Sequence, residues 1–91
     1  MLNIQYGRRF KKEFLNAIKQ PGNTPQMLQD VVDILIKEEQ LPEKYKDHKL
    51  KGTYTGYREC HLAPDWLLIY KLDKDKLILT LTRTGGHSDL F

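Results

Sequence analysis

The stretch from Tyr57 to Arg83, YRECHLAPDWLLIYKLDKDKLILTLTR, predicts three successive strands and therefore decides the fold. We expect these strands at 57–62, 66–72 and 77–83. A turn at 73–75 separates the second strand from the third. Connections this short join antiparallel neighbours, so the stretch predicts an antiparallel meander.

Alternation along these strands predicts a core face and an open face. Cys60 and Leu62 indicate the core side of the first strand, so His61 should lie on the opposite, open side. Along the third strand we expect three leucines to pack against helices, and three alternate residues to lie on the partly solvated face. The leucines are Leu77, Leu79 and Leu81, and the alternate residues are Ile78, Thr80 and Thr82.

The first half of the chain predicts a strand at 2–6 and then two amphipathic helices. Phe10, Phe14, Ala17 and Ile18 form the apolar stripe of the first helix. Thr24 and Pro25 are suited to the N-cap and first position of the second helix, whose buried stripe is Leu28, Val31, Val32, Leu35 and Ile36. A tight turn at 21–23 should make the helices a hairpin. With a short strand near 48–50, the whole chain, 1–91, is predicted to be a single α+β domain.

Charge suggests a polyanionic partner. The net charge is +3, the sequence pI is about 9.0, and the basic residues form two clusters. The first cluster contains Arg8, Arg9, Lys11, Lys12 and Lys19, and the second contains Lys44, Lys46, Lys49, Lys51 and Arg58. Clustered cations favour nucleic acid over a membrane as partner, although a merely solvated face has the same composition.

Cysteine usage and hydropathy narrow the class of protein further. The single cysteine, Cys60, cannot form an internal disulfide or a zinc site by itself, and its place in an apolar strand indicates a buried small side chain. No apolar run is long enough to span a membrane, and no secretory signal is apparent. We therefore expect a cytoplasmic protein without membrane association.

Three histidines and one aspartate are candidates for acid–base chemistry. His48, His61 and His87 all lie in the second half of the chain. Asp65 follows His61, in the predicted connection between the strands at 57–62 and 66–72. Histidine has a pKa near 6.5 and can exchange protons at physiological pH. Cleaving RNA by attack of its own 2′-hydroxyl needs a base, an acid and cations that stabilise the phosphorane. The candidate cations are Lys49, Lys51 and Arg83, and the aromatic residues that could stack on bases are Trp66 and Phe91.

Each of these residues also has a purely structural interpretation. Trp66 opens an apolar strand and could belong to the core, Asp65 could only shape a turn, and Arg83 could only pair with an acid. The histidines together with Asp65 could suggest zinc, but their spacing matches no compact metal motif. From the residues alone, the composition indicates a small basic α+β domain.

Two motifs resemble the YafQ family of bacterial toxins, within the RelE superfamily. The first is YRECHLAPDWLLIYK at 57–71, and the second is LTRTGGHSDLF at 81–91. The likeness covers essentially the whole chain and includes the segment DHKLKG at 47–52. It implies a RelE-like fold, in which helices cover one face of the sheet.

The resemblance also implies the toxin of a type II toxin–antitoxin system, an endoribonuclease that cuts messenger RNA in the ribosomal decoding site. No metal and no cofactor are implied. The implied catalytic set is His48, His61, Asp65 and His87, with the roles of base and acid left open because coupled groups titrate together. Trp66 and Phe91 are implied to hold the substrate, and Arg83 to stabilise the phosphate.

The implied partners are the ribosome, messenger RNA and an acidic antitoxin similar to DinJ. Operator DNA would be bound only through the antitoxin complex. The cations of the first helix could serve ribosomal RNA or the antitoxin, since both need the same charge. Two alternatives remain on the same fold: an inhibitor of gyrase similar to the ParE branch, and a module that binds RNA or the ribosome without cutting.

Overall fold

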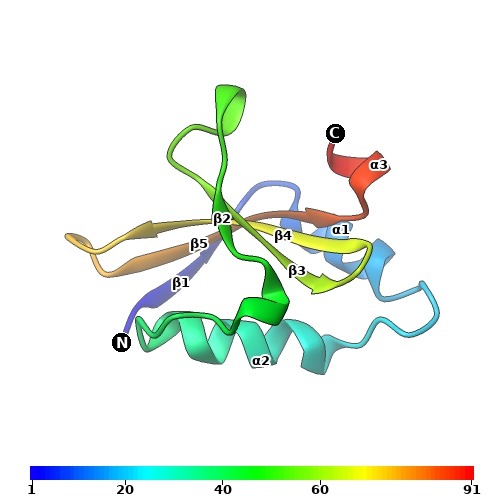
Figure 1. Ribbon diagram of the computed structural model, residues 1–91, viewed down its shortest axis with the longest axis horizontal. Coiled ribbons are helices and arrows are strands. Elements are labelled where there is room, and N and C mark those ends of the chain that lie inside the picture. The colour runs from blue at the N-terminus through cyan, green and yellow to red at the C-terminus, as the bar shows by residue number, and fades with distance from the viewer.

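A five-stranded mixed sheet forms the centre of the computed structural model, which describes residues 1–91 (Figure 1). The strands are β1 (Asn3–Tyr6), β2 (His48–Lys49), β3 (Arg58–Ala63), β4 (Trp66–Asp73) and β5 (Ile78–Gly85). Their order is β1-β5-β4-β3-β2, and all neighbours are antiparallel except β1 and β5. The predicted α+β class and meander are confirmed, and the first strand adds a parallel edge to the meander.

Two helices cover one face of this sheet. These are α1 (Phe10–Ala17) and α2 (Pro25–Ile36), and Pro25 occupies the first helical turn as predicted. Thr24 is the N-cap, but its side chain accepts no capping hydrogen bond. The helices do not form a mutually packed hairpin, because α1 packs chiefly on β5 and α2 on β3. The sheet therefore holds the two helices in place.

The core between the helices and the sheet contains the residues that alternation predicted. Cys60 and Leu62 of β3, and Leu79 and Leu81 of β5, are buried there with side chains from both helices. Leu77 is an exception. It precedes β5, has a φ of 58° and is 47% exposed. Leu77 ends the turn between β4 and β5, in which the Asp73 carboxylate accepts a hydrogen bond from the Lys76 backbone N–H.

The other face of the sheet is only partly open. The connection between β2 and β3, with the 3₁₀ turn η2 (Gly52–Tyr54), rises from this face beside the short C-terminal helix α3 (His87–Leu90) (Figure 1). The connection and α3 enclose a small second core of Leu67, Ile69 and Leu90, against which Leu50, Tyr54 and Tyr57 pack. We call this side of the sheet the site face.

A β-bulge in β5 decides which residues reach the site face. Tyr70 pairs with Leu81 but the preceding Ile69 pairs with Arg83, so Thr82 is an extra residue. Strict alternation would place Arg83 on the same side as Leu81, toward the helices. The bulge instead places Arg83 beside Ile69 on the site face. Gly7 fits against the bulge, since a Cβ there would lie 2.5 Å from the Thr82 carbonyl oxygen.

None of the helices is both long and apolar enough to cross a membrane.

Candidate active site

The predicted histidines are brought onto the site face from three separate elements. His48 lies on β2 directly opposite Glu59, His61 lies two residues along β3 from Glu59, and His87 begins α3. The rings of His61 and His87 stand 5.7 Å apart between centroids, at 62° to one another. The site therefore combines residues from the middle and the very end of the chain, with the apolar floor of Leu67 and Ile69 beneath them.

Asp65 and His87 form an exposed carboxylate–imidazole pair. Asp65 Oδ1 lies 2.7 Å from His87 Nδ1 and also accepts from the His87 backbone N–H at 3.0 Å. These two hydrogen bonds, the backbone one foremost, hold the pKa of the Asp65 carboxyl below its usual range. Because an ionised carboxylate can only accept, Nδ1 carries the proton, which leaves Nε2 for a substrate. The side chains are 75% and 57% exposed, so a substrate can reach them.

Gly86 lets the chain pass close to this pair. A Cβ at Gly86 would lie 3.0 Å from Asp65 Oδ2. The absence of a side chain thus allows the turn between β3 and β4 to approach the start of α3. This contact explains why two segments 22 residues apart in sequence share one hydrogen-bonded site.

His61 is half-buried on the site face, two residues along β3 from Glu59. Burial lowers the pKa of His61, and Glu59 opposes that effect. The positive charges of Lys46, His87 and His48 lower the pKa further. His61 is therefore a neutral imidazole near pH 7, a form that can accept a proton.

Arg83 is held by two partners. Its guanidinium donates to both oxygens of Glu13, with Nη2 2.5 Å from Oε2, and Nη1 donates to the Tyr54 hydroxyl at 3.1 Å. These bonds raise the pKa of Arg83, so it stays charged. Glu13 also accepts from the backbone N–H of Thr84, on the part of β5 that β1 does not cover. Arg83 thus joins α1, η2 and β5, as well as lying on the site face.

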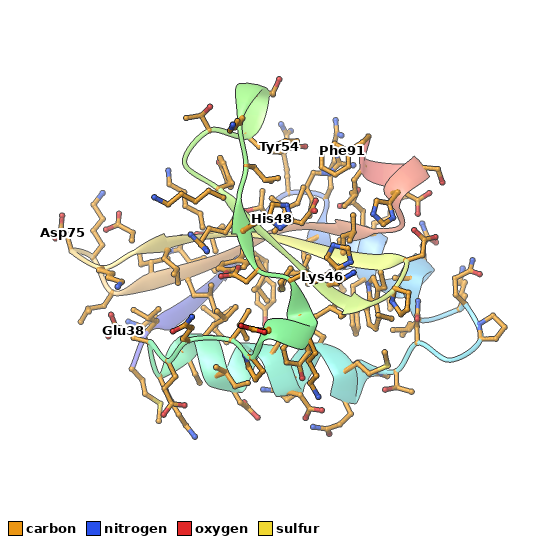
Figure 2. All side chains as sticks on the ribbon, viewed as in Figure 1. Glu38, Lys46, His48, Tyr54, Asp75 and Phe91 are labelled. Atoms are coloured by element: carbon orange, nitrogen blue, oxygen red, sulfur yellow. The ribbon has the colours of Figure 1, made fainter.

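The two predicted aromatic residues have different surroundings. Phe91 is 66% exposed and its ring meets Tyr54 edge-on, with centroids 6.3 Å apart (Figure 2). Trp66 is 1% exposed, packs near Phe14 on the helix side, and donates its indole N–H to Thr84 Oγ1 at 2.8 Å. The expectation that Trp66 holds the substrate is therefore wrong, because a ring buried in the core cannot stack on a base.

The two predicted lysines are exposed. Lys49 pairs with Arg58 in the ladder, one residue from the rung of His48 and Glu59. Alternation places Lys49 on the opposite side of β2 from His48, and its role as a substrate-binding cation stays a prediction. Lys51 lies in the connection before η2 and stays a prediction.

No group of three or more His, Cys, Asp or Glu side chains is placed to hold a metal ion. Two of the three histidines pair with one carboxylate each, His87 with Asp65 and His48 with Glu59.

Comparison with known proteins identifies the family. Residues 2–91 match the family described as a bacterial toxin of type II toxin–antitoxin system, YafQ. The chain belongs to this family. It is 39% identical over 89 residues to the mRNA interferase toxin YafQ of Escherichia coli K12, a match that covers 98% of this chain and 95% of that protein.

Solved structures of similar toxins share the fold over its full length. A metal-bound toxin from Helicobacter pylori is 44% identical and superposes with a TM-score of 0.90 over the whole of both chains. YafQ in the Escherichia coli DinJ–YafQ complex is 38% identical, with a TM-score of 0.87 over 100% of this chain and 99% of that one. The predicted resemblance to the YafQ family and the RelE-like fold are confirmed.

Three residues of this YafQ-family site were missed by the sequence reasoning. Glu59 faces His48, Tyr54 contacts both Arg83 and Phe91, and Glu13 binds Arg83 from 70 residues away. Only Glu59 had a usable signal, since alternation placed it on the face of His61. The contacts of Tyr54 and Glu13 depend on tertiary packing and left no trace in the local pattern.

Proposed function

We propose that this toxin is an endoribonuclease that cuts messenger RNA on the ribosome and thereby stops translation. One observation carries the proposal: the hydrogen-bonded pair of Asp65 and His87 stands 5.7 Å, between ring centroids, from the neutral His61 on an exposed face. Two imidazoles at this separation can exchange protons with the attacking 2′-oxygen and the leaving 5′-oxygen of one phosphodiester. The name mRNA interferase carried by the Escherichia coli relative supports the same activity.

The reaction would be an internal transfer of the phosphoryl group. The 2′-oxygen attacks phosphorus as its proton passes to one imidazole, and the bond from phosphorus to the 5′-oxygen breaks as that oxygen receives a proton. The products are a 2′,3′-cyclic phosphate and a free 5′-hydroxyl. Asp65 would stabilise the charged form of His87 during this cycle, and each positioned proton-transfer group contributes about 10²–10⁴-fold.

The cations and aromatic residues of the site face would bind rather than react. Arg83 remains charged in its bond to Glu13 and lies on the same face as His61, so its field favours a phosphate there. Phe91, exposed beside Tyr54, is suited to stacking on a base. Trp66 has no part in the proposed contacts.

The exposure of the site supports dependence on the ribosome. His87 and Asp65 are mostly open to solvent, and the groove that reaches Asp65 is itself open. Orientation is worth many orders of magnitude in rate, so a shallow site needs its substrate to be positioned from outside. The decoding site would provide that positioning, and the toxin would then act in the cytoplasm.

The antitoxin partner would cover the cations in and around α1. Arg8, Arg9, Lys11, Lys12 and Lys19 are all exposed. Arg9, Lys12 and Lys19 line an open groove that extends to Asp65, so an acidic chain bound there would also block the site. The DinJ–YafQ complex of the Escherichia coli relative supports an antitoxin of this kind, and operator DNA would be bound through it.

Mapping of RNA ends on translating ribosomes tests the proposal. We expect wild type to cut within the codon in the decoding site, and His87→Ala to leave the message intact. Ser88→Ala, an exposed neighbour on α3, is the matched control and should cut like wild type. Arrest of growth without any cut by wild type would overturn the proposal in favour of an inhibitor that binds without cleaving.

A further inference from the structure

Glu59 is a buried carboxylate with an unused oxygen. It lies at the centre of the site face, on one rung of the ladder with His48 on β2 and Ile69 on β4. Its side chain is 7% exposed. Oε1 is 3.4 Å from His48 Nε2, while Oε2 is buried without any hydrogen-bond partner. A carboxylate is rarely buried unless a positive charge or a proton accompanies it.

The nearby cations are engaged elsewhere and do not accompany Glu59. Arg58 is bound to Asp47, which also accepts from the Tyr70 hydroxyl, on the helix side of the sheet. Arg83 is bound to Glu13. His48 is the one basic group that forms an ion pair with Glu59, so any compensating proton resides on this pair.

The hydrogen bonds of His48 fix where that proton lies. Nδ1 is 2.7 Å from the backbone carbonyl oxygen of Lys46. A carbonyl oxygen only accepts, so Nδ1 must carry a hydrogen. In a neutral ring Nε2 would then be bare, and its lone pair would face a carboxylate oxygen. That arrangement is repulsive, and a proton on Nε2 turns it into an ion pair.

We propose that Glu59 is a positioning residue that keeps His48 in the doubly protonated, cationic form. This inference rests on the proposed function for its use: His48 would enter the reaction as a resident cation that keeps its proton, not as the base. The contact of 3.4 Å between Nε2 and Oε1 is long for a hydrogen bond, so the Nε2–H can also turn to a phosphate oxygen. Glu59 itself is too buried to touch the substrate.

Other titratable groups around the pair act against this charge. His61 on β3 and His87 on α3 lie on the same face, and Lys46 precedes β2. Lys46, His48 and His87 disfavour positive charge on His61, and Glu59 alone favours it. Removing the charge of Glu59 should therefore deprotonate His48 and lower the pKa of His61 further.

Nitrogen-15 NMR of the histidine rings in the intact protein tests this proposal directly. An ordinary histidine is about one-tenth protonated at about pH 7.5. We expect both ring nitrogens of His48 to be protonated in most molecules of wild type at that pH. A neutral His48 ring with a bare Nε2 in wild type would overturn the proposal, whatever the outcome for cleavage.

Glu59→Gln makes the test sharper because it changes hydrogen-bonding type without changing shape. The glutamine amide can donate to a bare Nε2 while Nδ1 still donates to the Lys46 carbonyl, so His48 should become neutral in place. The control is Glu43→Gln, which removes the same charge from an exposed position in η1 (Glu43–Tyr45) and should leave the ring protonated. Should Glu59→Gln not fold, the wild-type spectrum still decides; a protonated His48 in a folded Glu59→Gln would contradict the role of Glu59.

Discussion

The two carboxylate–imidazole pairs of the site face contain the same chemical groups but differ in burial. The Asp65 side chain is 75% exposed, whereas that of Glu59 is 7% exposed. Water can solvate Asp65, so His87 can gain and lose a proton while its partner stays ionised. Glu59 would become a bare buried anion if His48 lost its proton. Exposure thus suits the pair of Asp65 and His87 to proton exchange, whereas burial suits the pair of Glu59 and His48 to holding a fixed charge.

Replacing the imidazole of the exposed pair should have the largest effect. We expect His87→Ala to slow cleavage of ribosome-bound messenger RNA about 100-fold or more, because it removes a group that exchanges a proton with the substrate. The measurement is the single-turnover rate, with Ser88→Ala as control. A loss of only a few-fold would mean that His87 is not part of the chemistry.

Replacing the carboxylate of the exposed pair should have a smaller effect. Asp65→Asn keeps the size of the side chain but removes the charge that stabilises the imidazolium of His87. A hydrogen bond to a charged group is worth about 1.5–3 kcal/mol, which corresponds to about 10–100-fold in rate. Asp75→Asn, in the exposed turn before β5, is the matched control. Equal rates for Asp65→Asn and wild type would make Asp65 a structural residue of the turn.

The pH dependence of the wild type separates the roles of the histidines. Burial lowers the pKa of His61, so its neutral form persists as the pH falls below the usual histidine value. We expect cleavage to hold from about pH 7 to about 6 and to fall below that, as His61 becomes protonated. A profile that stays flat between about pH 5 and 8 would contradict proton exchange by histidine.

The smallest expected effect is on the carboxyl of Asp65 itself. Its pKa is lowered first by the backbone N–H of His87 and then by the ring. His87→Ala removes only the second, so carbon-13 NMR should find the pKa raised but still below the ordinary value of about 3.9. Because the folded-state pKa is depressed, the associated stability is present above that ordinary value and is lost as the pH falls through the folded-state pKa. An ordinary pKa in wild type would contradict the pairing.

Much of the fold was predictable because the local patterns are strong. Alternation located β3, β4 and β5, and it placed Cys60 in the core and His61 on the other side. Leu77 was misplaced because turn geometry at its φ of 58° overrode alternation. The parallel pairing of β1 with β5 has no local signal, since it joins the two ends of the chain.

Candidate residues for the site could be selected from the sequence, but their positions relative to one another could not. A β-bulge at Thr82 reverses the face of Arg83, and no local pattern reveals a single extra residue in a strand. The burial of Glu59 depends on its tertiary surroundings, which alternation along one strand does not reveal. Trp66 was misjudged because its neighbours in sequence are candidate catalytic residues, while its neighbours in space are Phe14 and Thr84.

The most direct test of the difference between the two pairs compares the pH–rate profiles of Asp65→Asn and Glu59→Gln on ribosome-bound messenger RNA. We predict that Asp65→Asn cuts more slowly than wild type at every pH between about 6 and 8, including the acidic end, because Asp65 orients the His87 ring as well as stabilising its charge. Glu59→Gln should lose progressively more activity than wild type as the pH rises through about 6.5, because His48 no longer keeps its proton. Parallel losses in both variants would contradict the distinction between an exchanging pair and a fixed charge.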